Sequence, residues 1–129
     1  MPFVNPSIIW RTGALFTASG IITGAFGSHA LKSRYPDLSP FSVQSWSTAS
    51  QYLIFNGVSL LAISLHPRFG TARGRLAFPS MAIAAGTLMF SGSIFPLVLA
   101  RQKMGKFLGP VTPLGGSVMI LGYLSMVVL

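Results

Sequence analysis

The sequence predicts an all-α, polytopic integral membrane protein, a bundle of four transmembrane helices. Of its 129 residues, 51% are hydrophobic and 8% are charged, and the mean hydropathy is +0.67. Soluble domains carry about 25% charged residues, so this chain has too few charges to cover a water-facing surface. The apolar residues also gather in four long runs, and short loops between the runs hold most of the basic residues. At this length we expect a single domain over residues 1–129.

The charge balance is strongly positive, with nine Lys and Arg against one acidic residue, Asp37. Nucleic-acid binding is one interpretation of such a balance. However, the basic residues form no stripe along a helix, and anionic lipid headgroups beside short loops explain them better. One acid cannot form the carboxylate pair of a glycosidase or an aspartic protease. With no cysteine and two histidines, the sequence predicts no metal site, no cofactor and no enzyme.

The first helix is expected near residues 8–28, close to the roughly 20 residues that a membrane span needs. Ser7 is placed to cap it. Small residues recur on one of its faces: Gly13, Thr17, Gly20, Gly24 and Ser28. Such faces let helices approach closely in lipid, and Gly20 and Gly24 should form the tightest part. We therefore expect Gly24→Leu to destabilise the bundle by roughly 1–3 kcal/mol. A cleaved signal peptide or a mitochondrial targeting segment is the alternative interpretation of this stretch.

The second helix is expected near residues 45–65, after a loop at residues 31–43 that contains two prolines. Its polar residues fall on one face at helical spacing: Thr48, Tyr52, Asn56 and Ser59. This face should point into the bundle, because lipid cannot satisfy polar groups. We expect the Asn56 amide to bond to another helix, with the first or third as its partner.

The third and fourth helices are expected near residues 76–99 and 112–129, with a loop at residues 100–111 between them. Pro96 should kink the third helix or reshape its last turn. Thr112 is placed to cap the fourth helix, with Pro113 at its first position. Gly115 and Gly116 then mark a close approach to a neighbouring helix. Four spans put both termini on one side, and nearly equal numbers of basic residues on the two sides leave the orientation open.

Four short motifs stand out in order along the chain: Gly24–Lys32, Trp46–Tyr52, Phe90–Ser93 and Thr112–Gly116. Their order and spacing resemble those of transmembrane protein 256 and its bacterial relatives, small four-helix membrane proteins described as domain of unknown function 423. The resemblance covers most of the chain from about Gly13 onward. The chain departs from this family at Asn56, where relatives often carry His, at Phe95, a frequent Tyr, and at Tyr123, a frequent Trp. The resemblance implies the fold and implies no activity, and the residue at position 56 puts in doubt any role that needs a ring nitrogen there.

Helix direction should bring these four motifs to the membrane face that carries residues 31–43, which we call the loop-one end. Six polar residues are therefore expected to surround one pocket there: His29, Lys32, Gln51, Tyr52, Ser93 and Thr112. An acidic phospholipid headgroup would suit the basic residues and the two helix N-termini expected at this end. The alternative is that these side chains only cap helices and satisfy one another.

For function we expect a non-enzymatic structural or accessory component that packs with itself or with other membrane protein subunits. The residues expected to carry helix packing are Gly13, Gly20, Gly24, Asn56, Gly115 and Gly116. The alternative is an acidic-lipid-binding or small-solute transport protein that uses the loop-one pocket. An enzyme comes last, because Ser91 or Ser93 with His29 lacks the acid of a catalytic triad. The membrane would be mitochondrial in a eukaryote and the plasma membrane in a bacterium.

Overall fold

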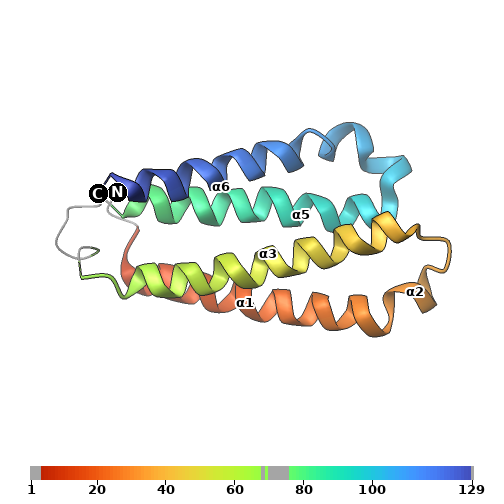
Figure 1. Cartoon of the computed structure of the whole chain (residues 1–129), viewed down its shortest axis with the longest axis horizontal. Helices are drawn as coiled ribbons and strands as arrows, with labels where there is room; N and C mark the ends of the chain where they lie inside the picture. Colours follow the sequence, from red (N-terminus) through yellow and green to blue (C-terminus); the bar gives the residue numbers. More distant parts are fainter. Residues whose placement is uncertain (1–3, 68, 70–75, 129) are drawn as a thin grey trace.

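The computed structural model describes residues 4–67, 69 and 76–128, with side chains for all of these except residues 101–104. Within these residues the chain forms helices and no strands. The helices are α1 (Pro6–His29), α2 (Leu31–Arg34), α3 (Pro40–Ser64), α5 (Ala77–Leu108) and α6 (Val111–Val127). Successive long helices run in opposite directions, so α1 begins and α6 ends at the same end of an elongated bundle (Figure 1). The other end carries α2 and is the loop-one end.

The starts of α1 and α3 follow one local rule, a capping side chain followed by proline. Asn5 caps α1 by accepting a backbone N–H of the first turn at 2.9 Å. Ser39 caps α3 by accepting a first-turn N–H at 3.1 Å, and Pro40 follows it. Proline suits this position because the N–H that it lacks would have no partner there. The predicted cap at Ser7 and the predicted loop through residue 43 are therefore wrong, since these local start signals precede the apolar runs.

The predicted loop also contains the short helix α2. Its first residue, Leu31, is fully buried in a cluster with Trp46 and Ile94. The next residues, including Lys32 and Arg34, are exposed. One buried leucine therefore fixes the basic segment against the end of the bundle.

The third long helix is longer than its apolar run predicts. Proline 96 lies inside α5, and Ala100 has non-helical backbone angles, φ −144° and ψ 47°. Beyond this kink the chain turns helical again and continues to Leu108, where a loop was expected. The missing N–H of Pro96 weakens the helix just before the kink. The fourth helix then starts at Val111 without a side-chain cap, and residue 129 of its predicted span lies outside the described residues.

Reciprocal glycine contacts hold the helices together in two hairpins, α1 with α3 and α5 with α6. A Cβ added to Gly13 would lie 2.6 Å from the Gly57 carbonyl oxygen, and a Cβ on Gly57 would lie 2.7 Å from the Gly13 oxygen. The second hairpin repeats this arrangement: a Cβ on Gly86 would lie 2.7 Å from the Gly115 oxygen, and one on Gly115 would lie 2.8 Å from the Gly86 oxygen. Backbones this close suit Cα–H···O contacts and small-residue packing in lipid.

The other glycines expected at interfaces differ in how tightly they pack. A Cβ on Gly20 would lie 2.7 Å from the Ser50 carbonyl oxygen, which leaves no room for a side chain. A Cβ on Gly24 would lie 3.7 Å from Ser50 Cβ, and one on Gly116 would lie 3.7 Å from an aromatic ring of α5; both are ordinary contacts. The tightest part of the α1 face is therefore nearer its start than predicted, because the ring of Trp46 occupies the interface beyond Gly24.

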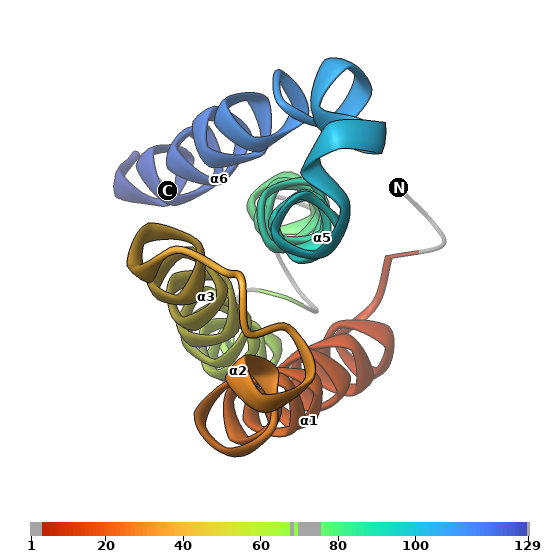
Figure 2. The same cartoon turned by 90° about the vertical axis from the view of Figure 1, so that its right-hand side faces the viewer.

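The two hairpins meet where α3 packs on α5, and these helices lie between α1 and α6 in the view down the bundle (Figure 2). Apolar side chains from both hairpins form one buried cluster: Ile9, Phe16, Leu53, Leu60, Ile63, Phe69, Leu76 and Ile83. A second cluster near the loop-one end contains Leu31, Trp46, Ala49, Ile94 and Val98. The bundle therefore has two clusters of buried apolar side chains in addition to its glycine contacts.

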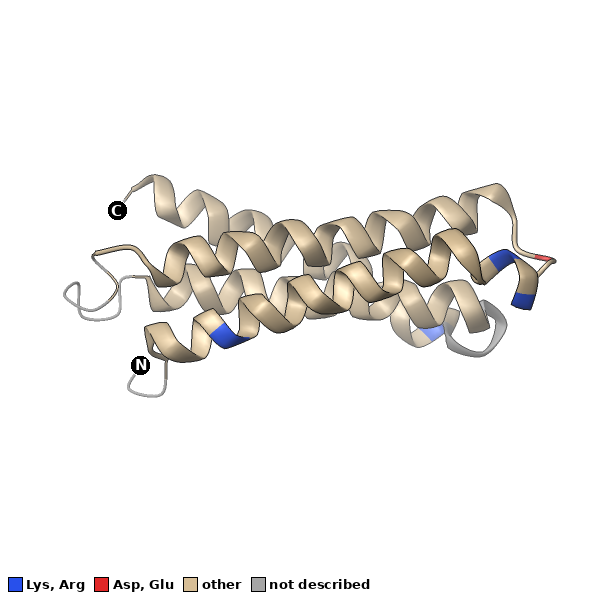
Figure 3. Cartoon of the chain, turned by 90° about the horizontal axis from the view of Figure 1, so that it is seen from below, with Lys and Arg blue, Asp and Glu red and all other residues tan. Residues whose placement is uncertain are grey.

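Two segments of the described chain, Ala77–Ala100 and Gly105–Val127, are long and apolar enough to cross a membrane. Helices α1 and α3 are long enough but less apolar, because they contain many Ser and Thr residues. Among the described side chains, Lys and Arg lie toward the two ends of the bundle and none lies in its middle (Figure 3).

Candidate functional site: a groove at the loop-one end

Two adjoining hollows at the loop-one end form one groove between α3, α5 and the start of α6. The outer hollow, of about 350 Å³, is lined by Phe41, Ser42, Ser45, Ile94, Leu97, Val98, Gly105, Gly109, Thr112 and Pro113. The inner hollow, of about 270 Å³, is lined by Phe41, Gln44, Ser45, Thr48 and Ile94. Phe41, Ser45 and Ile94 line both hollows, so we treat them as one feature, the α3–α5 groove.

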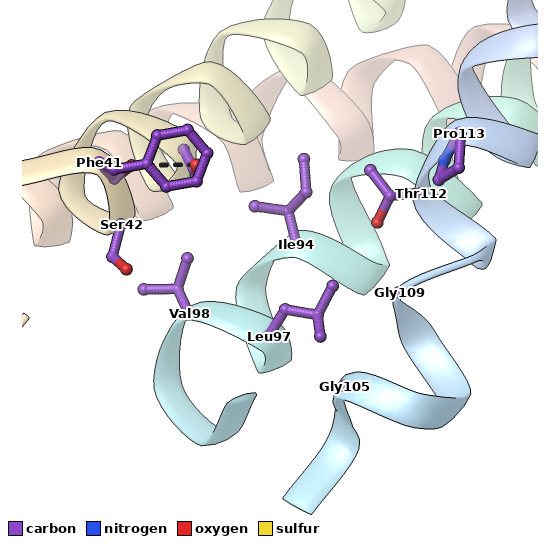
Figure 4. Close-up of a pocket in the computed structure, with 10 residues that line it drawn as sticks. Phe41, Ser42, Ile94, Leu97, Val98, Gly105, Gly109, Thr112 and Pro113 are labelled. Atoms are coloured by element: carbon purple, nitrogen blue, oxygen red, sulfur yellow. Dashed lines mark hydrogen bonds between the residues drawn. The ribbon is translucent and has the colours of Figure 1, made fainter. Parts of the chain in front are cut away.

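The walls of the groove come from three parts of the chain. In Figure 4, Ile94, Leu97 and Val98 of α5 lie opposite Phe41 and Ser42 of α3. The segment after the α5 kink and the first turn of α6 close the outer side. The groove therefore has an apolar floor, with hydroxyl groups along its α3 and α6 sides.

An aromatic stack marks the inner end of the groove. The rings of Tyr52 on α3 and Phe90 on α5 are stacked with their centroids 4.8 Å apart and an interplanar angle of 29°. Tyr52 follows Thr48 by one helical turn on the same face of α3, and Phe90 precedes Ile94 by one turn on α5. One turn deeper than the groove, the boundary between α3 and α5 is therefore filled by two rings.

Two of the six residues predicted for the pocket meet directly. The hydroxyls of Ser93 on α5 and Thr112 on α6 are hydrogen-bonded at 2.5 Å. Ser93 is buried, and Thr112 lines the groove. Thr112 therefore does not cap α6 as predicted, because its hydroxyl joins α6 to α5.

The other predicted residues do not gather in the same place. Lys32 lines a separate hollow of about 470 Å³ between the end of α1 and α3, together with Gly24, Gly27, Ser28, Val43, Trp46 and Ser47. Val43 and Ser47 project from the side of α3 opposite Ser45 and Thr48. His29 and Gln51 are exposed. The prediction of one shared pocket is thus wrong, because α3 separates Lys32 from Thr112.

Trp46, the first residue of the Trp46–Tyr52 motif, is a central residue of this end, and no role was predicted for it. Its indole N–H donates to the Thr23 carbonyl oxygen of α1 at 2.8 Å. Its ring packs against Phe26 of α1 and Phe95 of α5, with centroid distances of 5.6 and 4.7 Å. One side chain thus ties three helices together. The sequence did contain a signal for this residue, because it begins a set of residues at helical spacing. The structure buries all of them: Trp46, Ala49, Ser50, Leu53, Asn56, Gly57 and Leu60.

Asn56 forms a polar cross-link in the middle of the bundle. Its amide donates to the Met119 sulfur at 3.1 Å, and its carbonyl oxygen accepts the Tyr123 hydroxyl at 2.5 Å. Both partners belong to α6, so the predicted partner on the first or third helix is wrong. The backbones of α1 and α3 touch through glycine beside this residue, which leaves no space for its side chain on the α1 side.

This cross-link is expected to contribute modestly to stability. Tyr123→Phe removes one hydrogen bond and should lower the free energy of unfolding by about 0.6 kcal/mol, the average for bonds between membrane helices. Asn56→Leu should cost less than about 2 kcal/mol, because an apolar side chain fills the site. Unfolding in mild detergent measures both, and the double variant should cost less than the sum. Additive losses would show that the two side chains do not interact.

Polar side chains elsewhere in the core also bond between helices. Ser91 on α5 donates to the Ala49 carbonyl oxygen on α3 at 2.8 Å. Ser50 on α3 donates to the Thr23 hydroxyl on α1 at 3.0 Å. Each buried side-chain nitrogen and oxygen of the described residues has a hydrogen-bond partner. Among the same residues, no three His, Cys, Asp or Glu side chains lie close enough to hold a metal ion.

Comparison with known proteins identifies relatives that cover nearly the whole chain. A UPF0382 membrane protein of Schizosaccharomyces pombe is 38% identical over 93% of this chain and 98% of its own length. A UPF0382 membrane protein of Staphylococcus aureus strain RF122 is 34% identical over 90% of this chain and 88% of its own. The UPF0382 membrane protein YwdK of Bacillus subtilis is 29% identical, again over 90% of this chain. No solved structure matches the chain.

The family model described as "Protein of unknown function (DUF423)" matches residues 23–116. This range contains the groove, Trp46 and Asn56. The relatives in yeast and bacteria carry the name membrane protein, which agrees with the apolar helices found here. The chain is therefore an integral membrane protein and belongs to the DUF423 family.

Proposed function

We propose that this protein is a non-enzymatic structural or accessory component of its membrane, acting through helix packing with itself or with other membrane protein subunits. The observation that carries the proposal is the use of the buried polar side chains. Ser50, Ser91, Asn56 and Trp46 each bond from one helix to another. Groups that in a transporter or enzyme would face a substrate serve here to hold the bundle together.

The candidate nucleophiles also support a non-enzymatic role. Ser91 is fully buried and donates to the Ala49 carbonyl oxygen. Ser93 is bonded to Thr112, and His29 is exposed at the end of α1. A hydroxyl nucleophile needs a base within hydrogen-bonding reach, and neither serine has His29 as its partner.

We also propose that all four long helices span the membrane as one domain. Helices α1 and α3 carry many hydroxyls, and several of these bond to carbonyls of their own helix, as Thr12 does to Ile8 at 2.9 Å, Thr17 to Gly13 at 2.8 Å and Ser45 to Phe41 at 3.0 Å. A hydroxyl satisfied in this way costs little in lipid. At 24 and 25 residues, both helices exceed the roughly 20 residues of a span.

Cysteine labelling tests the four spans. The chain has no cysteine, so single cysteines at Asn5, Ser39 and Gln102 report position without background. Membrane-impermeant reagent should reach Asn5 from one side only, and Ser39 and Gln102 from the other side only. Thr71 lies outside the described residues and is expected on the Asn5 side. Labelling of Asn5 and Thr71 from opposite sides would contradict four spans.

Purification from the native membrane tests the structural role. The tagged protein, extracted in mild detergent after cross-linking, should carry a stable protein partner or a second copy of itself, identified by mass spectrometry. A transport role predicts instead that the protein alone moves a solute into sealed vesicles. Recovery of a lone monomer that catalyses uptake would overturn the structural role.

Binding of an acidic phospholipid is a second candidate function. The observation in its favour is the α3–α5 groove, which lies at the loop-one end of the bundle near the exposed Lys106 and has an apolar floor. Such a lining suits a lipid better than a small polar solute. This role is compatible with a structural one, because lipids often fill the joints between membrane helices.

A further inference from the structure

We propose that the α3–α5 groove holds one acyl chain of an acidic phospholipid, whose headgroup lies at the loop-one end beside Lys106. The inference rests on the second of the two proposed functions and assigns its site. It places the lipid between α3 and α5, on the side of α3 opposite the predicted residue Lys32.

The length of the groove fits part of a lipid chain. Phe41, Ser45 and Thr48 mark its length along α3, two helical turns or about 10 Å. The stack of Tyr52 on Phe90 lies at the next turn and bounds the groove toward the middle of the bundle. A protein helix is about 10 Å wide with its side chains and would have to end against this stack. A flexible acyl chain can instead enter and bend.

The lining supplies a physical reason for a bound chain. Ile94, Leu97 and Val98 present aliphatic carbons on the α5 side. An empty space against such a wall forfeits dispersion contacts, and a lipid tail restores them. Because bulk lipid offers the tail an equally apolar environment, preference for one lipid class must come from the headgroup.

The charges at the mouth of the groove favour an acidic headgroup. Lys106 is exposed and directly follows Gly105, which lines the groove. The sequence contains only one acidic residue, Asp37, against nine Lys and Arg. A basic residue near the membrane surface contributes about 1 kcal/mol to the attraction of anionic lipid.

The test is native mass spectrometry of the full chain taken from nanodiscs of equal phosphatidylglycerol and phosphatidylcholine. The parent is expected to retain phosphatidylglycerol in preference to phosphatidylcholine. Ser45→Phe places a ring in the groove, where the native hydroxyl bonds only within its own helix at 3.0 Å, and should abolish most retention. Lys106→Gln should lower the preference for phosphatidylglycerol about fivefold, the ratio that 1 kcal/mol produces. High salt should also lower the preference for phosphatidylglycerol.

Matched variants on the other side of α3 make the outcome specific. Ser47→Phe and Lys32→Gln change the same residue types in the separate hollow, and both should retain lipid like the parent. Thr48→Phe blocks the groove at a second position in case Ser45→Phe does not fold. Loss of lipid in Ser47→Phe but not in Ser45→Phe or Thr48→Phe would overturn the proposed site while leaving lipid binding intact. Equal retention of both lipids by every variant would overturn selective binding of acidic lipid and leave the structural role untouched.

Discussion

Replacing Gly86 by leucine is expected to lower the free energy of unfolding by about 3 kcal/mol, the upper part of the range for overpacked interfaces. A Cβ at this position would lie 2.6 Å from Met119 Cγ and 2.7 Å from both the Met119 nitrogen and the Gly115 oxygen. Two of these three atoms are backbone, so α6 must move as a whole to admit a side chain. Reversible unfolding in mixed detergent micelles measures the loss.

Gly92 on the same helix provides the matched control. A Cβ added there has no atom within 4 Å, so Gly92→Leu should be neutral or slightly stabilising because leucine is the better helix former by nearly 1 kcal/mol. The pair separates a packing effect from a helix-propensity effect. Equal stabilities for Gly86→Leu and Gly92→Leu would show that the α5–α6 contact is looser than described.

Replacing Trp46 by alanine is expected to cost about 3 kcal/mol, the low end of the range for large aromatic residues in cores. The variant loses the bond to the Thr23 carbonyl oxygen and the packing against Phe26 and Phe95. Since these contacts join three helices, the loop-one end should also become more accessible in hydrogen exchange.

The second tryptophan of the chain is the control for this variant. Trp10 on α1 is 46% exposed, whereas Trp46 is 5% exposed. Trp10→Ala should therefore change the free energy of unfolding by less than about 0.5 kcal/mol, as surface substitutions usually do. If both variants unfolded alike, Trp46 would not be the joint between α1, α3 and α5.

The sequence predicts the four long helices because each contains a local signal, whereas the short helix α2 lies in a stretch that was predicted as a loop. The apolar runs give the existence of the four long helices. The starts of α1 and α3 could also have been predicted, since Asn5 and Ser39 each precede a proline. Hydropathy alone puts the first residue of α3 too far along the chain. The helical stretch beyond Ala100 could not be predicted, because its basic residues interrupt the apolar pattern that marks a membrane span.

The candidate site was harder to predict because it depends on helix rotation. Chain direction fixes which end of the bundle a residue occupies, and all six predicted residues come from segments near the loop-one end. It does not fix which side of a helix faces which neighbour. Ser45 and Ser47 are two residues apart, and they line different hollows. In the same way, Asn56 bonds to α6 because glycine contacts with α1 had already occupied the adjacent side of α3.

The reciprocal glycine pairs, Gly13 with Gly57 and Gly86 with Gly115, bear on how the chain is assembled during synthesis. Each pair joins helices that are consecutive among the long ones, and each depends on backbone atoms of those two helices alone. The residues of the Gly13–Gly57 contact are therefore all synthesised before α5, so we expect the α1–α3 hairpin to form without α5. The two halves are expected to enter the bilayer as preassembled pairs, and the side chains of α3 and α5 then dock one pair onto the other.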